Sequence, residues 1–431
     1  MGFISLRRGR LVLACAPVLL AGCLPFDFSP PLDESNPGSE QVLGASAERP
    51  PAADRFGDLE PNDDFATAQP VAFVETVRLE GAIAAQSSLD VDVFDLGPAH
   101  VGDRVMGALS ILNGSDLVLG VYDDRQRLLG YVDQSSSATG PREMDIVVRE
   151  ATVQLFAVVT TRSTASQDRA YSASISILRN GGIPSLRPQV VVLSFNGASQ
   201  VRIGSRPPVD VPAFDAANIS SRFAGQTESI IALIFENVAA DFAGLNVSFY
   251  RAGDPAIPAG NRSVVHYGTY DSRLLGLADN IDPYNSDTAQ SAILFTDTFS
   301  VFNALSPGVA DIAQVLANTT SHEVGHLLGL RHTADPTDLM DTTATARQML
   351  LDQDFSFASL NPSVLALGYQ DAPSMLSWGA GGTLLPPPAG KLVQRQLALR
   401  YTGGPDDFYV PRSWLMTCGC AECDHEADQT Q

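Results

Sequence analysis

The stretch SHEVGHLLGLRH, residues 321–332, decides the fold and chemistry of this chain, and DLMD follows it at residues 338–341. His322 and His326 stand four residues apart, so on a helix both imidazoles leave the same face one turn apart. Gly329 is the residue type that ends a helix in a left-handed turn, because it has no Cβ to clash. Such a turn can bring the chain back toward the helix, so that the imidazole of His332 supplies a third nitrogen. Three neutral imidazoles suit one zinc ion with an open fourth position, which is the catalytic arrangement.

Glu323, next to the first histidine, can reach a water at that open position and act as a general base. The alternative interpretation is a helix whose histidines are satisfied in the core. Five fixed positions, three of them the scarce residue histidine, make that alternative the poorer explanation.

The pattern HExxHxxGxxH resembles the zinc site of the metzincin metallopeptidases. The distance from His332 to Met340 is most similar to the spacing in matrixins. The resemblance implies that the three histidines bind zinc, that Glu323 is the base, and that Met340 lies in a tight turn beneath the metal. Thr333 and Asp341 depart from the matrixin pattern, which has Ser and Tyr at these places, and they leave the subfamily open.

The predicted function is therefore a zinc-dependent metalloendopeptidase that hydrolyses a protein or peptide substrate by a zinc-activated water. An alternative from another class is a surface binding or adhesion module in which the peptidase domain is a non-catalytic scaffold. That alternative predicts the loss of a ligand or of the base, and the sequence retains all four residues.

The chain is strongly acidic, with 27 Lys and Arg against 49 Asp and Glu and a formal net charge of −22. Nucleic acid is an unsuitable partner, because contacts with phosphates need a basic patch. No stretch of eighteen or more apolar residues is present, so no transmembrane helix is predicted.

The first 22 residues have the pattern of a targeting segment, with three arginines before a short apolar run. The LAGC that ends at Cys23 resembles the lipobox of bacterial lipoproteins, which implies cleavage before Cys23 and acylation of its thiol. A plain secretory signal is the alternative. Leu24 after the cysteine favours an outer-membrane or cell-surface location. Residues 23–57, rich in Pro, Ser and acidic side chains, are predicted to be a flexible tether.

Residues 58–178 predict an all-β sandwich, because short alternating or apolar runs are separated by turn residues every eight to twelve positions. The predicted strands cover residues 77–83, 104–112, 117–122, 145–148, 153–159 and 171–178.

The start of this region, DLEPNDDFATA at residues 58–68, and DVDVF at residues 90–94 resemble the bacterial pre-peptidase C-terminal domain. In calcium-binding members of that family such acidic segments ligate the ion. The matching residues here are Asp58, Glu60, Asn62, Asp63, Asp90 and Asp92. Two interpretations remain open, a calcium site or a capped turn with solvated carboxylates.

Residues 187–379 are predicted to form an α+β metzincin-like catalytic domain, so the fold class is an all-β sandwich followed by an α+β zinc peptidase domain. Apolar residues spaced by four predict a helix at residues 226–242, and the zinc helix is expected at 307–329. Residues 292–296 are the candidate edge strand for substrate pairing. The loop with Asp279, Asp282, Asn285 and Asp287 is interpreted as polar, with a structural ion as the alternative.

Residues 380–431 form a Gly- and Pro-rich tail that contains Cys418, Cys420 and Cys423. Their spacing is tighter than that of the usual zinc fingers. A disulfide with one free thiol, or a disordered tail, is therefore favoured over a metal clip.

Overall fold

The computed structural model describes residues 54–386, except 73–74, 86–89, 114–115, 135–142 and 162–166. The predicted targeting segment, Cys23, nearly all of the predicted tether and the three cysteines of the tail lie outside the described residues. Among the residues that are described, no helix is long and apolar enough to cross a membrane.

The N-terminal region folds into two five-stranded sheets. One sheet has the order β1-β3-β10-β5-β8, and the other has the order β2-β4-β9-β6-β7. The first comprises β1 (Asp54–Gly57), β3 (Thr76–Ile83), β10 (Arg169–Leu178), β5 (Arg104–Ile111) and β8 (Glu143–Val147). The second comprises β2 (Gln69–Pro70), β4 (Asp92–Asp95), β9 (Phe156–Thr161), β6 (Leu117–Tyr122) and β7 (Leu128–Asp133).

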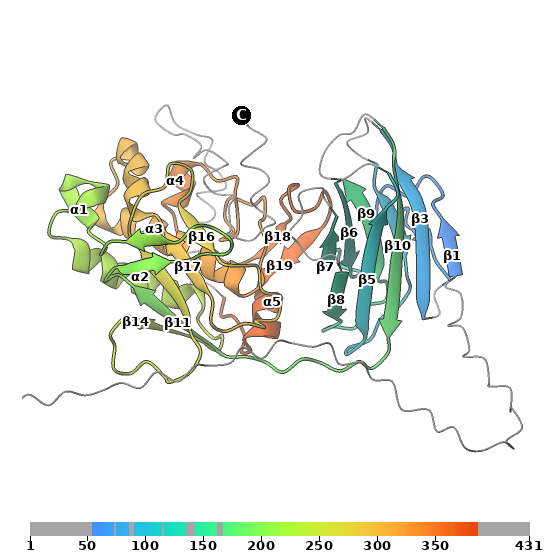
Figure 1. Ribbon diagram of the computed structural model, residues 1–431, viewed down its shortest axis with the longest axis horizontal. Coiled ribbons are helices and arrows are strands. Elements are labelled where there is room, and N and C mark those ends of the chain that lie inside the picture. The colour runs from blue at the N-terminus through green and yellow to red at the C-terminus, as the bar shows by residue number, and fades with distance from the viewer. Residues whose placement is uncertain are drawn as a thin grey trace, which may run out of the picture. The chain divides into compact units, whose positions relative to one another are not determined.

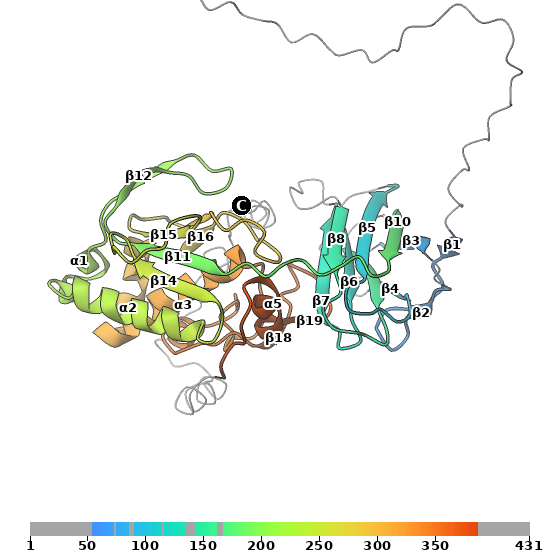
Figure 2. The same ribbon diagram turned by 90° about the horizontal axis from the view of Figure 1, so that it is seen from below.

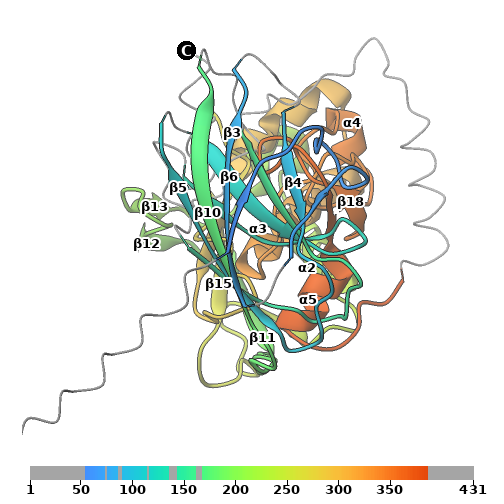
Figure 3. The ribbon, with the colours of Figure 1, turned by 90° about the vertical axis from the view of Figure 1, so that its right-hand side faces the viewer.

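The two sheets share one apolar core, as expected for a sandwich. Strand β10 alternates between buried and partly exposed residues, so its inward face packs while the other faces outward. Leu79 of β3, Ile175 of β10 and Leu119 of β6 all belong to the same buried cluster, although they come from both sheets. Figure 3 shows β3, β5 and β10 in one layer and β4 and β6 in the other. The predicted sandwich is confirmed.

Strand β1 differs from the prediction, because its four residues fall within the predicted tether. It pairs in parallel with β3, from Asp54 opposite Val77 to Gly57 opposite Glu80. Three of its four residues are exposed, so it leaves little hydrophobic signal and is held through its backbone. The predicted strand ranges also do not include β2, β4 or β7.

The second region is built on a sheet with the order β14-β11-β15-β17-β16. Its strands are β14 (Val247–Arg251), β11 (Gln189–Ser194), β15 (Ser263–Tyr267), β17 (Ser291–Leu294) and β16 (Gly276–Ala278). The first four are mutually parallel, and β16 is antiparallel to β17. The prediction that residues 292–296 form the edge strand is therefore wrong. This segment corresponds to β17, which has a neighbour on both sides, and the edge strand is the shorter β16. A strand of three residues is too short to show a hydrophobic pattern, so β16 could not be identified from the sequence.

Two long helices pack against this sheet, α2 (Thr227–Asp241) and α3 (Val309–Leu327). In α2 the stripe Ile230, Ile234 and Val238 is buried, as the spacing by four predicts. Figure 2 shows α2 and α3 on the same side of the sheet, with β12 (Ala198–Val201) away from them. The face that α3 buries carries the predicted histidines into the interior.

Shorter elements complete this region. They are β12 (Ala198–Val201), β13 (Val209–Val211), α1 (Ala216–Ile219), η1 (Ser221–Phe223), η2 (Thr296–Leu305), α4 (Ala346–Met349), β18 (Phe357–Ser359), β19 (Tyr369–Asp371) and α5 (Ala372–Gly379). The hairpin β18–β19 and helix α5 follow the zinc helix in the chain, as Figure 1 shows by their orange and red colours.

Candidate active site

Helix α3 has defined ends that place its histidines. Its first turn is capped by Asp311, which accepts a hydrogen bond from the amide of Gly308 at 2.8 Å. At the other end the amide of Leu330 donates to the carbonyl of Gly325, and the amide of Gly329 to that of His326. These bonds form a Schellman motif, which needs a left-handed residue.

Gly329 supplies that residue, with φ of +95°. A Cβ there would also lie 2.8 Å from Cα of Pro283 and 2.9 Å from the carbonyl oxygen of Asp282. Glycine is thus required both by the turn and by the close passage of another loop. The predicted left-handed turn is present, and it redirects the chain toward His332.

The three histidines converge through their Nε2 atoms. Nε2 of His326 lies 3.1 Å from Nε2 of His322 and 3.1 Å from Nε2 of His332. All three are buried, and His326 is inaccessible to solvent. Nδ1 of His322 contacts the carbonyl oxygen of Leu339 at 2.7 Å, and Nδ1 of His326 contacts that of Leu330 at 2.9 Å.

These contacts test whether the cluster suits a zinc ion. A carbonyl can only accept, so Nδ1 of His322 and Nδ1 of His326 each carry the proton. Their Nε2 atoms then carry lone pairs that face one another, which is no hydrogen bond and is unfavourable without a cation between them. Burial lowers the pKa of His322 to about 4 and lowers the pKa values of His326 and His332 well below 6.5. Neutral imidazoles with converging lone pairs are the donor set that zinc takes.

Met340 packs directly against the backbone of α3 between the first two histidines. A Cβ added at Gly325 would lie 2.6 Å from the sulfur of Met340, and Met340 is fully buried. The preceding residue, Leu339, supplies the carbonyl that orients His322. The turn predicted beneath the metal therefore also fixes the tautomer of the first histidine.

Glu323 is buried, and its Oε2 atom has no hydrogen-bond partner. Burial raises the pKa of its carboxyl well above 4.5. Its other oxygen lies against Gly276 of the edge strand β16, where a Cβ would overlap Oε1. A buried carboxyl oxygen without a hydrogen-bond partner destabilises the folded state. A role in catalysis explains the position of Glu323 better than a role in stability does.

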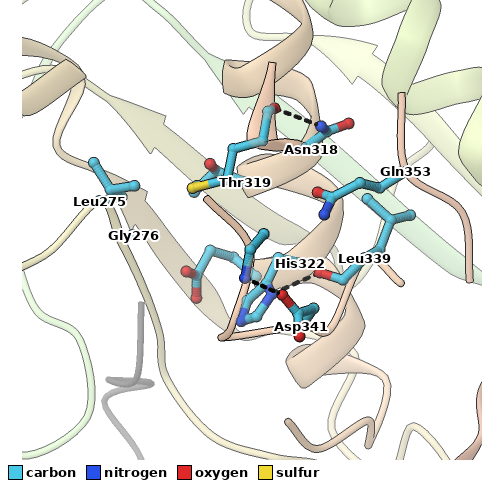
Figure 4. Close-up of a pocket in the computed structure, with 11 residues that line it drawn as sticks. Leu275, Gly276, Asn318, Thr319, His322, Leu339, Asp341 and Gln353 are labelled. Atoms are coloured by element: carbon cyan, nitrogen blue, oxygen red, sulfur yellow. Dashed lines mark hydrogen bonds between the residues drawn. The ribbon is translucent and has the colours of Figure 1, made fainter. Parts of the chain in front are cut away.

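A pocket opens beside His322 and Glu323, with about 400 Å³ of space that includes the open mouth. Its lining also includes Leu275, Gly276, Asn318, Thr319, Leu339, Asp341, Ala344, Met349 and Gln353. Figure 4 shows His322 beside Leu339 and Asp341, with Leu275 and Gly276 on the opposite side of the pocket. Burial raises the pKa of Asp341 to about 7, although amides of Thr343 and Ala344 donate to it.

The six residues of the predicted calcium site also come together, in the sandwich. The carboxylates of Asp58, Glu60 and Asp92 form one group, and those of Glu60, Asp63 and Asp90 form a second. Asn62 joins them, since its Nδ2 donates to Asp58 at 2.9 Å. The Oδ1 atoms of Asn62 and Asp92 are buried and have no hydrogen-bond partner.

The electrostatics of this acidic cluster are unfavourable without a cation. Burial raises the pKa of Asp92 to about 8, although Tyr171 donates to it, and Asp58, Asp90 and Glu60 raise it further by repulsion. The pKa values of Asp58 and Glu60 are raised as well, mainly by burial.

In the loop of residues 279–287, the carboxylates of Asp279 and Asp282 accept hydrogen bonds from the protein itself, as expected for a polar loop. Asp282 accepts hydrogen bonds from the amide of Asp287 at 2.7 Å and from Nε2 of Gln290 at 2.9 Å. Asp279 accepts from the amides of Gly204 and Ser291. Their carboxylates thus bind the protein's own donors.

Three residues near the histidines were not singled out from the sequence. Gly276 contacts the predicted base, Asp338 bonds to the turn that carries Met340, and Gln370 bonds to Arg331 beside the third histidine. Asp338 lies in the quoted DLMD, but no spacing rule marks it, and Gln370 comes from a strand of three residues.

Residues 205–356 match the model of the matrixin family. This match confirms the predicted resemblance to matrixins for this part of the chain. No curated protein matches the chain. The class of protein that the match supports is a zinc metallopeptidase.

Several solved structures are similar at low identity. The archaemetzincin of Methanopyrus kandleri is 14% identical, with 39% of this chain and 89% of that chain covered and a TM-score of 0.23. The pre-peptidase C-terminal domain of a Bacillus anthracis collagenase is 13% identical, with 30% and 98% covered and a TM-score of 0.19. The periplasmic lysozyme inhibitor PliG of Aeromonas hydrophila is 14% identical, with 30% and 100% covered and a TM-score of 0.21.

Proposed function

We propose that the chain is a zinc-dependent metalloendopeptidase, with its catalytic centre at His322, His326, His332 and Glu323. The observation that carries the proposal is the convergence of three buried Nε2 atoms, together with the unpartnered Oε2 of Glu323 on the helix that carries His322 and His326. A satisfied core would leave neither feature, because both cost free energy.

Each residue has a distinct role in the proposed reaction. His322, His326 and His332 would hold zinc, which supplies Lewis acidity that lowers the pKa of water and polarises a carbonyl. Oε2 of Glu323 takes a proton from the water that attacks the scissile carbonyl carbon. Glu323 then gives this proton to the nitrogen of the leaving amine as the C–N bond breaks.

The edge strand β16 is suited to align the peptide. One side of β16 pairs with β17, and Gly276 of β16 lines the pocket beside Glu323. An extended peptide that adds to the other side would bring its backbone past the base.

The proposal is tested by two substitutions with opposite expectations for zinc. Glu323→Gln should keep its zinc, because three imidazoles remain, while peptide hydrolysis falls by about 10²–10⁴-fold. His326→Ala should lose zinc and activity together. Zinc content and cleavage of a mixed peptide library are measured on the same preparations. Cleavage by Glu323→Gln at the wild-type rate would exclude the role of the base. Wild type that holds zinc but cleaves nothing would favour the scaffold alternative.

The acidic cluster of the sandwich is proposed to bind calcium. Calcium takes six to eight oxygen ligands, and this cluster gathers five carboxylates around the side-chain amide of Asn62. The unpartnered Oδ1 atoms of Asn62 and Asp92 are the specific support. Isothermal titration of metal-free protein with calcium tests the idea, and the absence of any binding heat or stabilisation would exclude it.

The protein is proposed to be extracytoplasmic and anchored to a bacterial membrane, in the outer membrane or at the cell surface, through lipid on Cys23. The support is the sequence LAGC after a basic and apolar leader. Cys23→Ser should move the protein from the membrane fraction to the soluble fraction. An unchanged distribution between the fractions would contradict the lipid anchor.

A further inference from the structure

The third histidine differs from the other two in how it is held. His322 and His326 lie on α3, whose backbone fixes their spacing. His332 lies beyond Gly329, outside any helix or strand. Its position therefore depends on contacts of the segment around it, residues 330–334, which we term the ligand arm.

Gln370 of β19 binds the ligand arm immediately before His332. Its Oε1 accepts from the amide of Arg331 at 2.7 Å, and its Nε2 donates to the carbonyl of Arg331 at 2.8 Å. Gln370 is 2% exposed, so water does not replace these two bonds easily. A side-chain amide that bonds both backbone groups of one residue acts as a substitute for a neighbouring strand.

Other bonds hold the arm on the far side of His332. The amide of Asn361 donates to the carbonyl of His332 at 3.1 Å, and the amide of Thr333 donates to that of Met340 at 2.9 Å. Oγ1 of Thr333 donates to Asp338, which also accepts from the amide of Met340, both at 2.9 Å. These contacts come from the turn and from residue 361. Within the part of the chain that the structure describes, Gln370 is the only side chain that bonds both backbone groups of a residue next to the histidine.

The strand that carries Gln370 is itself fixed. The amide of Tyr369, the first residue of β19, donates to the carbonyl of Gln126 at 2.9 Å. The next residue, Asp371, accepts from Nη1 of the buried Arg127 at 2.9 Å. A fixed strand gives Gln370 a rigid base from which to hold the arm.

We propose that Gln370 is a positioning residue that holds His332 in place for zinc and slows the release of the metal. This inference rests on the proposed zinc site. Outer-shell partners of metal ligands typically change metal affinity by about 10–100-fold when removed. Removal of the Gln370 side chain should weaken zinc binding by a factor in that range. The effect is limited because two of the three ligands, His322 and His326, remain fixed on α3.

The test compares two buried glutamines that lose their polar group. Gln370→Met removes both bonds to Arg331 with little change in volume. The matched control is Gln189→Met, at a glutamine that is 2% exposed and bonds to Ser263 in β15. Zinc-loaded wild type and both variants are mixed with excess chelator, and zinc release is followed without substrate. Melting temperatures of the zinc-free proteins are measured in parallel.

Gln370→Met should release zinc about 10–100-fold faster than wild type, while Gln189→Met should release it at the wild-type rate even where its melting temperature is lower. If Gln370→Met does not fold, Gln370→Glu keeps the acceptor for the amide of Arg331 and should show a smaller acceleration. A wild-type release rate in the folded Gln370 variant would overturn the inference. Equal acceleration in both Met variants would overturn it too, as a general effect of lost stability.

The outcome is separate from that of the proposed function. Wild type that retains zinc but cleaves no peptide would refute the peptidase and leave this inference supported by the release rates. Wild type that retains no zinc would refute both.

Discussion

The two clusters of candidate metal ligands in this chain are assembled with opposite electrostatics. The histidine cluster is neutral, because burial lowers the pKa values of its imidazoles. In the acidic cluster the ionised form of the carboxyls is unfavourable, because burial and mutual repulsion raise the pKa of Asp92 to about 8. A neutral cluster can form before its metal binds at a modest cost, whereas a cluster of carboxylates is relieved only by protons or a cation.

The two clusters also differ in what holds the ligands. The histidines of α3 are oriented by backbone carbonyls at Leu339 and Leu330. In the acidic cluster, Asn62 binds the carboxylates of Asp58 and Glu60 through its own amides at 2.9 and 3.0 Å. Fixed imidazoles suit the strict geometry of zinc, and carboxylates on a turn suit the looser coordination of calcium.

The largest expected effect concerns the base beside the histidines. A methyl group in Gly276→Ala would overlap Oε1 of Glu323, so the carboxyl must move. A displacement of about 1 Å in a catalytic group can cost about 10²-fold in rate. We expect about that loss in kcat/KM for a peptide, with zinc content unchanged, because no histidine is contacted.

The control for this prediction is Gly308→Ala at the start of α3. A methyl group there meets nothing closer than Oδ2 of Asp311 at 3.4 Å, so its activity should stay near that of wild type. Equal activity of the two variants would show that the approach of β16 to Glu323 is not needed for catalysis.

Much of this architecture could be predicted from the sequence, because the signals are local. The pattern HExxHxxGxxH determines a helix face, a turn and three nitrogens within eleven residues. The alternation in β10 and the stripe of α2 likewise determine which faces are buried. The grouping of Asp58 with Asp92 followed from resemblance to a family, since no spacing rule joins residues that far apart.

The remaining features depend on contacts between distant segments. Strand β16 has three residues, so its edge position follows from pairing with β17 and not from its own pattern. The contact of Gly276 with Glu323 and that of Gln370 with Arg331 each join separate elements. Strand β1 is mostly exposed and is defined only by its pairing with β3.

The second prediction separates two neighbouring carboxylates of the sandwich. Asp63 belongs to one carboxylate group of the acidic cluster, whereas Asp64 belongs to neither and instead accepts from Ala66 and Thr67. Calcium at ten times its dissociation constant should stabilise wild type by about 1.4 kcal/mol. Asp63→Asn should lose most of that gain, and Asp64→Asn should keep it. Thermal unfolding with and without calcium measures both, and an equal loss in the two variants would refute the assignment of Asp63.

The smallest effect concerns the pH dependence of the acidic cluster without calcium. The pKa of Asp92 is about 8 in the folded chain, against a reference of 3.8. Between these values the folded state binds a proton that the unfolded state has lost, so this group's contribution to stability falls as pH rises. From pH 7 to pH 8 the loss for one such group is about 1 kcal/mol. Asp92→Asn cannot titrate and should lack this component, as urea unfolding of chelator-treated protein at both pH values would show. With saturating calcium this dependence on pH should disappear, because calcium replaces the proton and neither the folded nor the unfolded state then binds a proton at Asp92 between pH 7 and pH 8. Parallel pH profiles of wild type and Asp92→Asn without calcium would contradict the raised pKa, and with it the electrostatic contrast between the two clusters.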